Sequence, residues 1–216
     1  MSPPENASEE VARLLLEIEA VTLSPRQPYT WASGVRSPIY CDCRRIASFP
    51  DARKFIEDAW AQLLRAEWPS VQAVVGVATG GVPHAALVAE RLGLPMAYVR
   101  SETKGHGLGK RVEGFLPKQV RVVVVEDLVS TGSSLLEAVK ALKTEDIQVV
   151  GATAVFSYGL DIAREAFARE GVPLRTLTGL SEVKRAAAAS GRLSAEELTL
   201  VDEGIARVAQ QLAARR

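Results

Sequence analysis

The sequence predicts an α/β fold in which a mostly parallel, twisted sheet carries helices on both faces. Four short runs are rich in β-branched residues and almost continuously apolar: residues 71–77, 96–99, 120–125 and 147–156. Such strands are typical of parallel sheets that are buried on both faces. Stretches with helical periodicity separate most of these runs, near residues 82–92, 133–143 and 160–170, and this alternation indicates a doubly wound sheet.

The elements on either side of these strands follow from local signals. Ser8 suits an N-cap, and apolar residues at helical spacing predict a helix over residues 8–21. Residues 25–45 are rich in Ser, Gly, Pro and aromatics, with short strands expected at 29–31 and 39–41. Pro50 opens an amphipathic helix, and a short strand with two Ala-rich helices is expected after residue 174. We therefore divide the chain into an N-terminal helix and hood (residues 1–50), an α/β core (51–190) and a C-terminal helix (191–216).

Composition excludes several classes of function. Lys plus Arg and Asp plus Glu number 26 each, so the formal net charge is zero. Proteins that bind nucleic acid or anionic membranes over a broad face usually carry a basic excess, so neither partner is expected. The uncharged stretch at 69–89 is interrupted by Thr79, Gly80 and Gly81, which argues against a membrane span. No secretory leader is recognisable, Cys41 and Cys43 are expected to be reduced thiols, and we expect a cytoplasmic protein.

The chemistry is expected at residues 122–134, which read VVVVEDLVSTGSS. Four valines bring Glu126 and Asp127 to the carboxyl end of a strand, where open α/β sheets bind ligands. The Ser/Thr/Gly loop that follows presents hydroxyls and backbone N–H groups at a helix start, which suits phosphate. Carboxylates for sugar hydroxyls beside amides for phosphate indicate a phosphorylated pentose. A helix cap beside a solvated strand end is the structural alternative, and a Walker B strand is excluded because no P-loop accompanies it.

A second anion-binding element is expected in the segment 100–111. Arg100, Lys104, His106, Lys110 and Arg111 face one acid there, and three glycines would let the segment move. Basic groups gathered in a neutral protein indicate neutralisation of a polyphosphate, and closure over the substrate would strengthen the contacts. A solvated surface loop is the alternative.

Two weaker candidates lie on and beside the predicted helix at 82–92. The ATGG segment at residues 78–81 ends another strand and is expected to add a phosphate contact. His84 has no evident partner in the sequence and is expected to be structural.

Three segments resemble one family in family order. Residues 122–134 resemble the 5-phosphoribosyl 1-pyrophosphate (PRPP) signature of the type I phosphoribosyltransferases. Residues 29–40 (YTWASGVRSPIY) resemble the base-recognition hood of orotate phosphoribosyltransferases, and residues 98–107 (YVRSETKGHG) resemble their mobile catalytic loop. The resemblance implies the type I phosphoribosyltransferase fold and transfer of the 5-phosphoribosyl group from PRPP to orotate, which yields orotidine 5′-phosphate and pyrophosphate.

The resemblance also implies roles for single residues. Lys104 and His106 are expected to be catalytic and to reach a neighbouring subunit's site on a loop of residues 101–114, which implies a homodimer. Ser130 is the expected orotate contact, and Mg²⁺ is expected to be carried by the PRPP diphosphate, with no metal site of the protein's own. Tyr40 is expected either to cover the pyrimidine ring or to lie in the core. The expected PRPP contacts are Arg100, Lys104, His106, Glu126, Asp127, Leu128, Val129, Ser130, Thr131, Gly132, Ser133 and Ser134.

The chain departs from the family pattern in two respects. Some members have Lys where this chain has Ala32, Gly80 and Ser101. Others hold the orotate carboxylate with an Arg after the strand that ends here at Phe156, whereas residues 157–159 offer no basic side chain. The carboxylate ligand therefore stays open. Two other functions also stay open: transfer to another base such as adenine or xanthine, and a PRPP-sensing regulator without catalytic activity.

Overall fold

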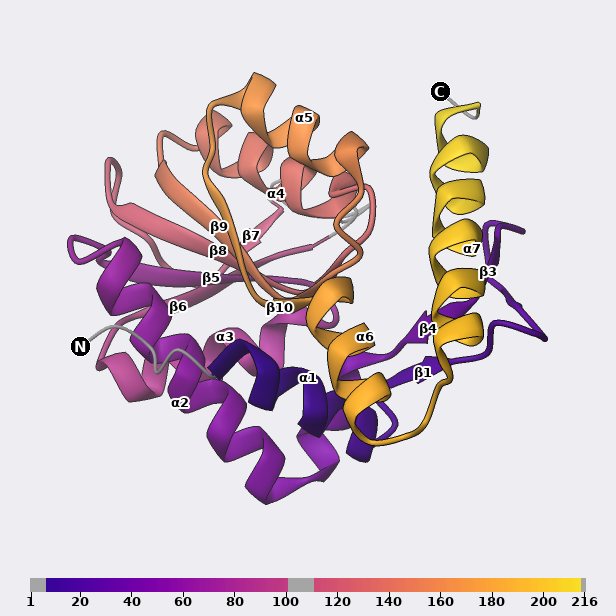
Figure 1. Ribbon diagram of the computed structural model, residues 1–216. Coiled ribbons are helices and arrows are strands. Elements are labelled where there is room, and N and C mark those ends of the chain that lie inside the picture. Colours follow the sequence, from indigo (N-terminus) through magenta and orange to yellow (C-terminus); the bar gives the residue numbers. More distant parts are fainter. Residues whose placement is uncertain (1–6, 101–110, 215–216) are drawn as a thin grey trace.

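The structure is a computed structural model that describes residues 7–100 and 111–214. Within these residues the core is a six-stranded sheet of order β10-β9-β8-β5-β6-β7 (Figure 1). All neighbouring strands are parallel except β6 and β7, so the predicted mostly parallel sheet is confirmed. The strands are β5 (Ala73–Val77), β6 (Met96–Val99), β7 (Val112–Glu113), β8 (Arg121–Val129), β9 (Gln148–Ser157) and β10 (Leu174–Gly179).

Helices cover both faces of this sheet because successive residues of a strand point to opposite sides. In β8, Val123 and Val125 pack in the core that α1, α2, α3 and α6 cover, whereas Val122 and Val124 pack in the core under α4 and α5 (Figure 1). The first group comprises α1 (Ala7–Glu17), α2 (Pro50–Glu67), α3 (Gly81–Leu92) and α6 (Leu180–Ala189). The second comprises α4 (Ser133–Thr144) and α5 (Asp161–Glu170).

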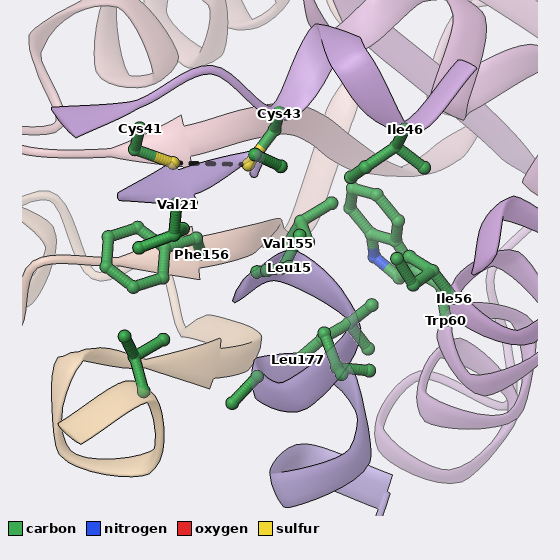
Figure 2. Packing of buried hydrophobic residues seen from close by; sticks show 14 of the residues in the cluster. Leu15, Val21, Cys41, Cys43, Ile46, Ile56, Trp60, Val155, Phe156 and Leu177 are labelled. Atoms are coloured by element: carbon green, nitrogen blue, oxygen red, sulfur yellow. Dashed lines mark hydrogen bonds between the residues drawn. The ribbon is translucent and has the colours of Figure 1, made fainter. Parts of the chain in front are cut away.

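The larger core joins the sheet to the N-terminal segment. Leu15 of α1 and Trp60 of α2 are fully buried and lie with Phe156 of β9 in one cluster (Figure 2). The Trp60 indole N–H donates to Thr153 Oγ1 at 3.0 Å, which satisfies the polar group of a fully buried ring. Full burial of each large apolar side chain stabilises the fold by about 1.5–3 kcal/mol, so this cluster fixes the base of the hood against the sheet.

The hood consists of two short antiparallel ladders and a 3₁₀ helix. β1 (Val21–Leu23) pairs with β4 (Ile39–Cys41), β2 (Tyr29–Thr30) pairs with β3 (Arg36–Ser37), and η1 (Cys43–Ser48) follows. The helix predicted over residues 8–21 was too long: α1 ends at Glu17, and Glu19 adopts a positive φ of 55° before β1 begins. The two predicted hood strands are present as β2 and β4, and each pairs with a further strand, β3 or β1, that sequence reasoning did not identify.

The C-terminal helix α7 (Ala195–Ala213) stands beside the hood rather than on the sheet (Figure 1). A Cβ on Gly204 would lie 2.6 Å from Pro38 Cγ, so α7 approaches the hood as closely as a helix backbone can. Ser194 and Glu197 form a capping box at its start. The strand and two helices expected after residue 174 are confirmed, whereas the boundaries at residues 50 and 190 stay a prediction. No helix in the described ranges is long and apolar enough to cross a membrane.

Most core elements match the predicted ranges, with one informative exception. α3, α4 and α5 begin and end within about one residue of the predicted helices. β8 was expected to end at residue 125 but runs to Val129, because Glu126, Leu128 and Val129 continue its pairing with β9. The two acids therefore belong to the strand itself, which fixes their backbone more firmly than a loop would.

Candidate active site

The carboxyl ends of β5 and β8 and the hood surround a cavity of about 630 Å³. This volume lies within the usual range of small-molecule sites. Of the predicted contacts, Val129 is not part of the lining: its side chain is buried in the core under α4 and α5. The lining residues are Cys41, Asp42, Arg44, Ala78, Thr79, Gly80, Glu126, Asp127, Leu128, Ser130, Thr131, Gly132, Ser133 and Ser134.

The two acids at the end of β8 differ in environment. Glu126 is 6% exposed, and its carboxylate accepts hydrogen bonds from the Asp127 backbone N–H (3.1 Å) and from Ser134 Oγ (3.2 Å). Burial, followed by the charge of Asp127, raises the pKa of Glu126 to about 8. Asp127 is half-buried, and its Oδ1 accepts from the Leu128 N–H at 2.8 Å. At neutral pH Glu126 is therefore mostly protonated.

The β8–α4 loop forms an anion cradle. Gly132 precedes α4 with a φ of 79°, a left-handed conformation that glycine adopts without strain. No side chain caps the helix, so its first backbone N–H groups are available to a ligand. Thr131 Oγ1 and Ser133 Oγ lie 2.8 Å apart and add hydroxyl groups to this end of the cavity. The loop hydroxyls, amides and acids thus lie around one space, and their roles in binding stay predictions.

The β5–α3 loop at residues 78–81 faces the acids from the other side. A Cβ on Gly80 would lie 2.5 Å from Asp127 Oδ2, and one on Gly81 would lie 2.3 Å from the Val125 carbonyl oxygen. The loop thus approaches β8 too closely for side chains at these two positions. A lysine at position 80, as in some members of the resembling family, would have to displace the Asp127 carboxylate. The peptide between Ala78 and Thr79 is cis.

The predicted catalytic loop is described only at its two ends. Arg100 donates its backbone N–H to the Arg111 carbonyl oxygen (2.9 Å), and the Arg111 Nε donates back to the Arg100 carbonyl oxygen (3.0 Å). The Arg100 guanidinium contacts Glu113 at 3.3 Å, and Arg100 is not among the described residues that line the cavity. Lys104 and His106 lie outside the described residues. The roles of all three stay predictions.

Sequence reasoning missed the contribution of the hood to the cavity. Asp42 and Arg44 both line it, and the Arg44 Nε donates to Asp42 Oδ1 at 2.6 Å. This hydrogen bond holds the pKa of Asp42 below its usual value. A signal was present, because Ile39, Cys41 and Cys43 are buried while the residues between them face outward. Such alternation places every second side chain of this segment on the cavity side.

The remaining candidates have clear positions. Tyr40 is 43% exposed and its ring lies 5.7 Å from that of Tyr29, so a core position is ruled out and the role over the pyrimidine ring stays a prediction. His84 is buried, and its Nδ1 lies 2.6 Å from Glu57 Oε1 between α2 and α3, as a structural role requires. Tyr158, which stands near the position of the absent Arg, packs edge-on against Trp31 with ring centroids 5.1 Å apart.

The two cysteines are free thiols packed together beneath the cavity. Their Sγ atoms lie 3.4 Å apart (Figure 2), and Cys43 is fully buried. The contact with Cys41, together with burial, raises the pKa of Cys43 well above its ordinary value. Cys43 is therefore unsuited to the role of a nucleophile.

Comparison with known proteins agrees with this geometry. The model of the phosphoribosyl transferase domain family matches residues 45–171. The chain is 50% identical over 194 residues to the orotate phosphoribosyltransferase of Lactococcus lactis subsp. cremoris (strain SK11), which covers 90% of this chain and 93% of that protein. The crystal structure of orotate phosphoribosyltransferase from Aeropyrum pernix superposes with a TM-score of 0.73 and 35% identity, covering 85% of this chain and 99% of that one.

A third similar protein was solved with a ligand. The Mycobacterium tuberculosis H37Rv orotate phosphoribosyltransferase in complex with PRPP superposes with a TM-score of 0.64 at 29% identity, covering 82% of this chain and 98% of that one. Half of the 194 aligned residues are therefore identical in a relative of nearly the same length, and the same fold recurs in the solved structures. The chain belongs to the orotate phosphoribosyltransferase family.

Proposed function

We propose that this chain transfers the 5-phosphoribosyl group of PRPP to orotate, forming orotidine 5′-phosphate and pyrophosphate in pyrimidine biosynthesis. The observation that carries the proposal is the pairing, in one cavity, of Glu126 and Asp127 with the uncapped start of α4. A phosphorylated ribose presents hydroxyls and phosphate at a spacing that needs both kinds of group. Membership of the family supports orotate as the second substrate.

Different residues of the cavity bind different parts of the two substrates. The amides and hydroxyls of residues 130–134 hold the 5′-phosphate, and the two carboxyl groups bind the ribose hydroxyls. Ser130 contacts the orotate ring, and the exposed ring of Tyr40 lies over it. Holding both reactants in line lowers the entropic part of the barrier.

The charges of Glu126 and Asp127 suit the breaking of the bond between the ribose and the diphosphate. The anomeric carbon becomes positive as diphosphate leaves, and orotate is already an anion with a nucleophilic ring nitrogen. The carboxyl oxygens of Glu126 and Asp127 face the ribose, so they present negative or partly negative charge to that carbon. Oxygens fixed in this way stabilise the transition state.

Mg²⁺ fits this donor set as a substrate-borne ion. The described residues contain no cluster of three or more His, Cys, Asp or Glu groups that could hold a metal. Mg²⁺ is usually bound through one or two carboxylates plus substrate phosphates, and Glu126 and Asp127 can supply the carboxylates. When bound, the ion neutralises the charge that accumulates on the departing diphosphate.

The decisive experiment follows orotate consumption by the purified full-length chain. We expect consumption that requires both PRPP and Mg²⁺, with Asp127→Asn lowering kcat about 10²–10³-fold because an electrostatic contact to the reacting sugar is lost. Adenine and xanthine in place of orotate should give no product. PRPP binding without turnover of any base would instead show a non-catalytic sensor and refute the proposal.

We also propose that the active protein is a cytoplasmic homodimer in which Lys104 and His106 serve the partner's site. Arg100 supports this arrangement, because it pairs with Glu113 instead of lining its own cavity. Mixing an inactive Lys104→Ala chain with an inactive Asp127→Asn chain tests it. Shared sites regain activity, since one site per mixed dimer is intact. A mixture that stays as inactive as its components would refute the shared loop.

A further inference from the structure

The described part of the cavity has an unusual charge balance for a site that takes a polyphosphate. Its lining contains three acids, Asp42, Asp127 and the mostly protonated Glu126, and Arg44 is the one cationic side chain among the described lining residues. Backbone amides at the starts of α3 and α4 offer partial positive charge. A substrate with phosphate at two ends requires more than this, because each end brings at least one full negative charge.

Arg44 is placed and oriented for such a ligand. Its side chain is 66% exposed, and Asp42 occupies only its Nε–H, at 2.6 Å. Its two terminal Nη groups make no hydrogen bond to any described residue and remain free to donate. A guanidinium fixed at Nε presents these groups as a planar fork, the geometry that recognises phosphate oxygens in pairs.

The position of Arg44 indicates which end of the cavity its side chain serves. Arg44 reaches the cavity from the α3 face of the sheet, because its neighbours Cys43 and Ile46 pack in the same core as α3, whereas α4 packs on the opposite face. Gly80 lies on the same side, where a Cβ would meet the Asp127 carboxylate. Glu126 instead bonds Ser134 at the α4 end. The cavity thus has an α4 end for one phosphate and an opposite end formed by Arg44 and residues 78–80.

We propose that Arg44 binds the diphosphate of PRPP, a contact that rests on the proposed function and adds a hood residue to the diphosphate end of the site. The backbone of residues 78–80 lies opposite and carries no charge of its own. Position 80 is Gly in this chain, so this loop brings no cation to the described cavity lining. The hood supplies it from the other wall.

The test compares three variants by ligand binding and kinetics. Inorganic pyrophosphate with Mg²⁺, ribose 5-phosphate and PRPP serve as probes in titration calorimetry. In Arg44→Ala we expect the Kd for pyrophosphate and for PRPP to rise roughly 10- to 100-fold, because charged hydrogen bonds are lost, while ribose 5-phosphate binds as before. Arg44→Lys keeps the charge without the fork and should fall between. Arg45→Ala removes the same charge one residue away, outside the cavity lining, and should bind as the wild type does.

Each alternative result has a separate meaning. If Arg44→Ala weakens ribose 5-phosphate or raises the KM for orotate while pyrophosphate binding is unchanged, Arg44 serves another end of the site and the proposal is wrong. Equal pyrophosphate binding by wild type and Arg44→Ala also overturns it, while leaving the proposed function intact. A wild-type chain that binds no PRPP refutes the proposed function and this inference with it.

Discussion

Replacing Glu126 by Gln should change how the stability of the protein depends on pH. The free carboxyl group of a glutamate in an unfolded chain has a pKa near 4.5, whereas burial raises that of Glu126 to about 8 in the folded state. The folded protein therefore holds this proton more tightly than the unfolded chain does. Its stabilising effect is complete below about pH 4.5 and is lost as the pH rises through 8, at about 1.4 kcal/mol per pH unit.

Gln has nearly the same shape but never ionises, so Glu126→Gln escapes this loss. The difference in unfolding free energy, wild type minus variant, should fall by on the order of 3–5 kcal/mol between pH 4.5 and 9. Urea unfolding at four pH values, extrapolated linearly to water, measures each term. Taking the difference cancels the titration of every other independent group.

An exposed carboxylate on α5 provides the control. Glu165→Gln should show a difference that stays within about 0.5 kcal/mol across the same pH range, since surface substitutions rarely do more. If the Glu126→Gln difference is flat, or rises with pH, then Glu126 ionises normally in the folded protein. The account of a carboxyl group that burial keeps protonated at neutral pH would then fail.

Three further changes have defined outcomes. Asp127→Asn removes the second cause of the raised pKa of Glu126, so that pKa should fall. The stabilisation by protonated Glu126 should then be lost over a pH range that ends at a lower pH, as urea titrations of Glu126→Gln in the Asp127→Asn background would show. Gly80→Ala should raise the KM for PRPP at least about tenfold, because its Cβ would lie 2.5 Å from Asp127 Oδ2; unchanged kinetics would contradict that contact. Gly151→Ala should destabilise the fold by about 1–3 kcal/mol or more without changing KM, because its Cβ would lie 2.2 Å from Trp68 Cε2, and a denaturation midpoint equal to wild type would refute the packing argument.

The elements that sequence patterns predicted well are those whose signal is local. β8 reads as four valines followed by two acids, and both the strand and its site follow from that order alone. The start of α4 was equally easy to predict, because a Ser/Thr/Gly loop before an apolar helix has few functions other than binding an anion. By contrast, the end of α1 depends on the positive φ of Glu19, which no residue pattern predicts.

The parts of the site that were missed depend on contacts between distant segments. Arg44 follows a strand by only three residues, and its place in the cavity is set by how the hood folds over β8. The close approach of Gly80 to Asp127 joins a loop to a strand residue that lies 47 positions further along the chain. β7 has only two residues and pairs at the sheet edge, too short for periodicity to reveal. Long-range geometry of this kind needs coordinates.

The contact between Gly204 and Pro38 sets a limit on when the catalytic pocket can be completed during synthesis. The hood precedes the whole sheet in the chain, whereas the helix that braces it follows the sheet. Until α7 has left the ribosome, the nascent chain has a hood without its outer support. A truncated product that lacks α7 should therefore retain the sheet and lose the wall that carries Tyr40 and Arg44, so it would be folded but unable to complete its pocket.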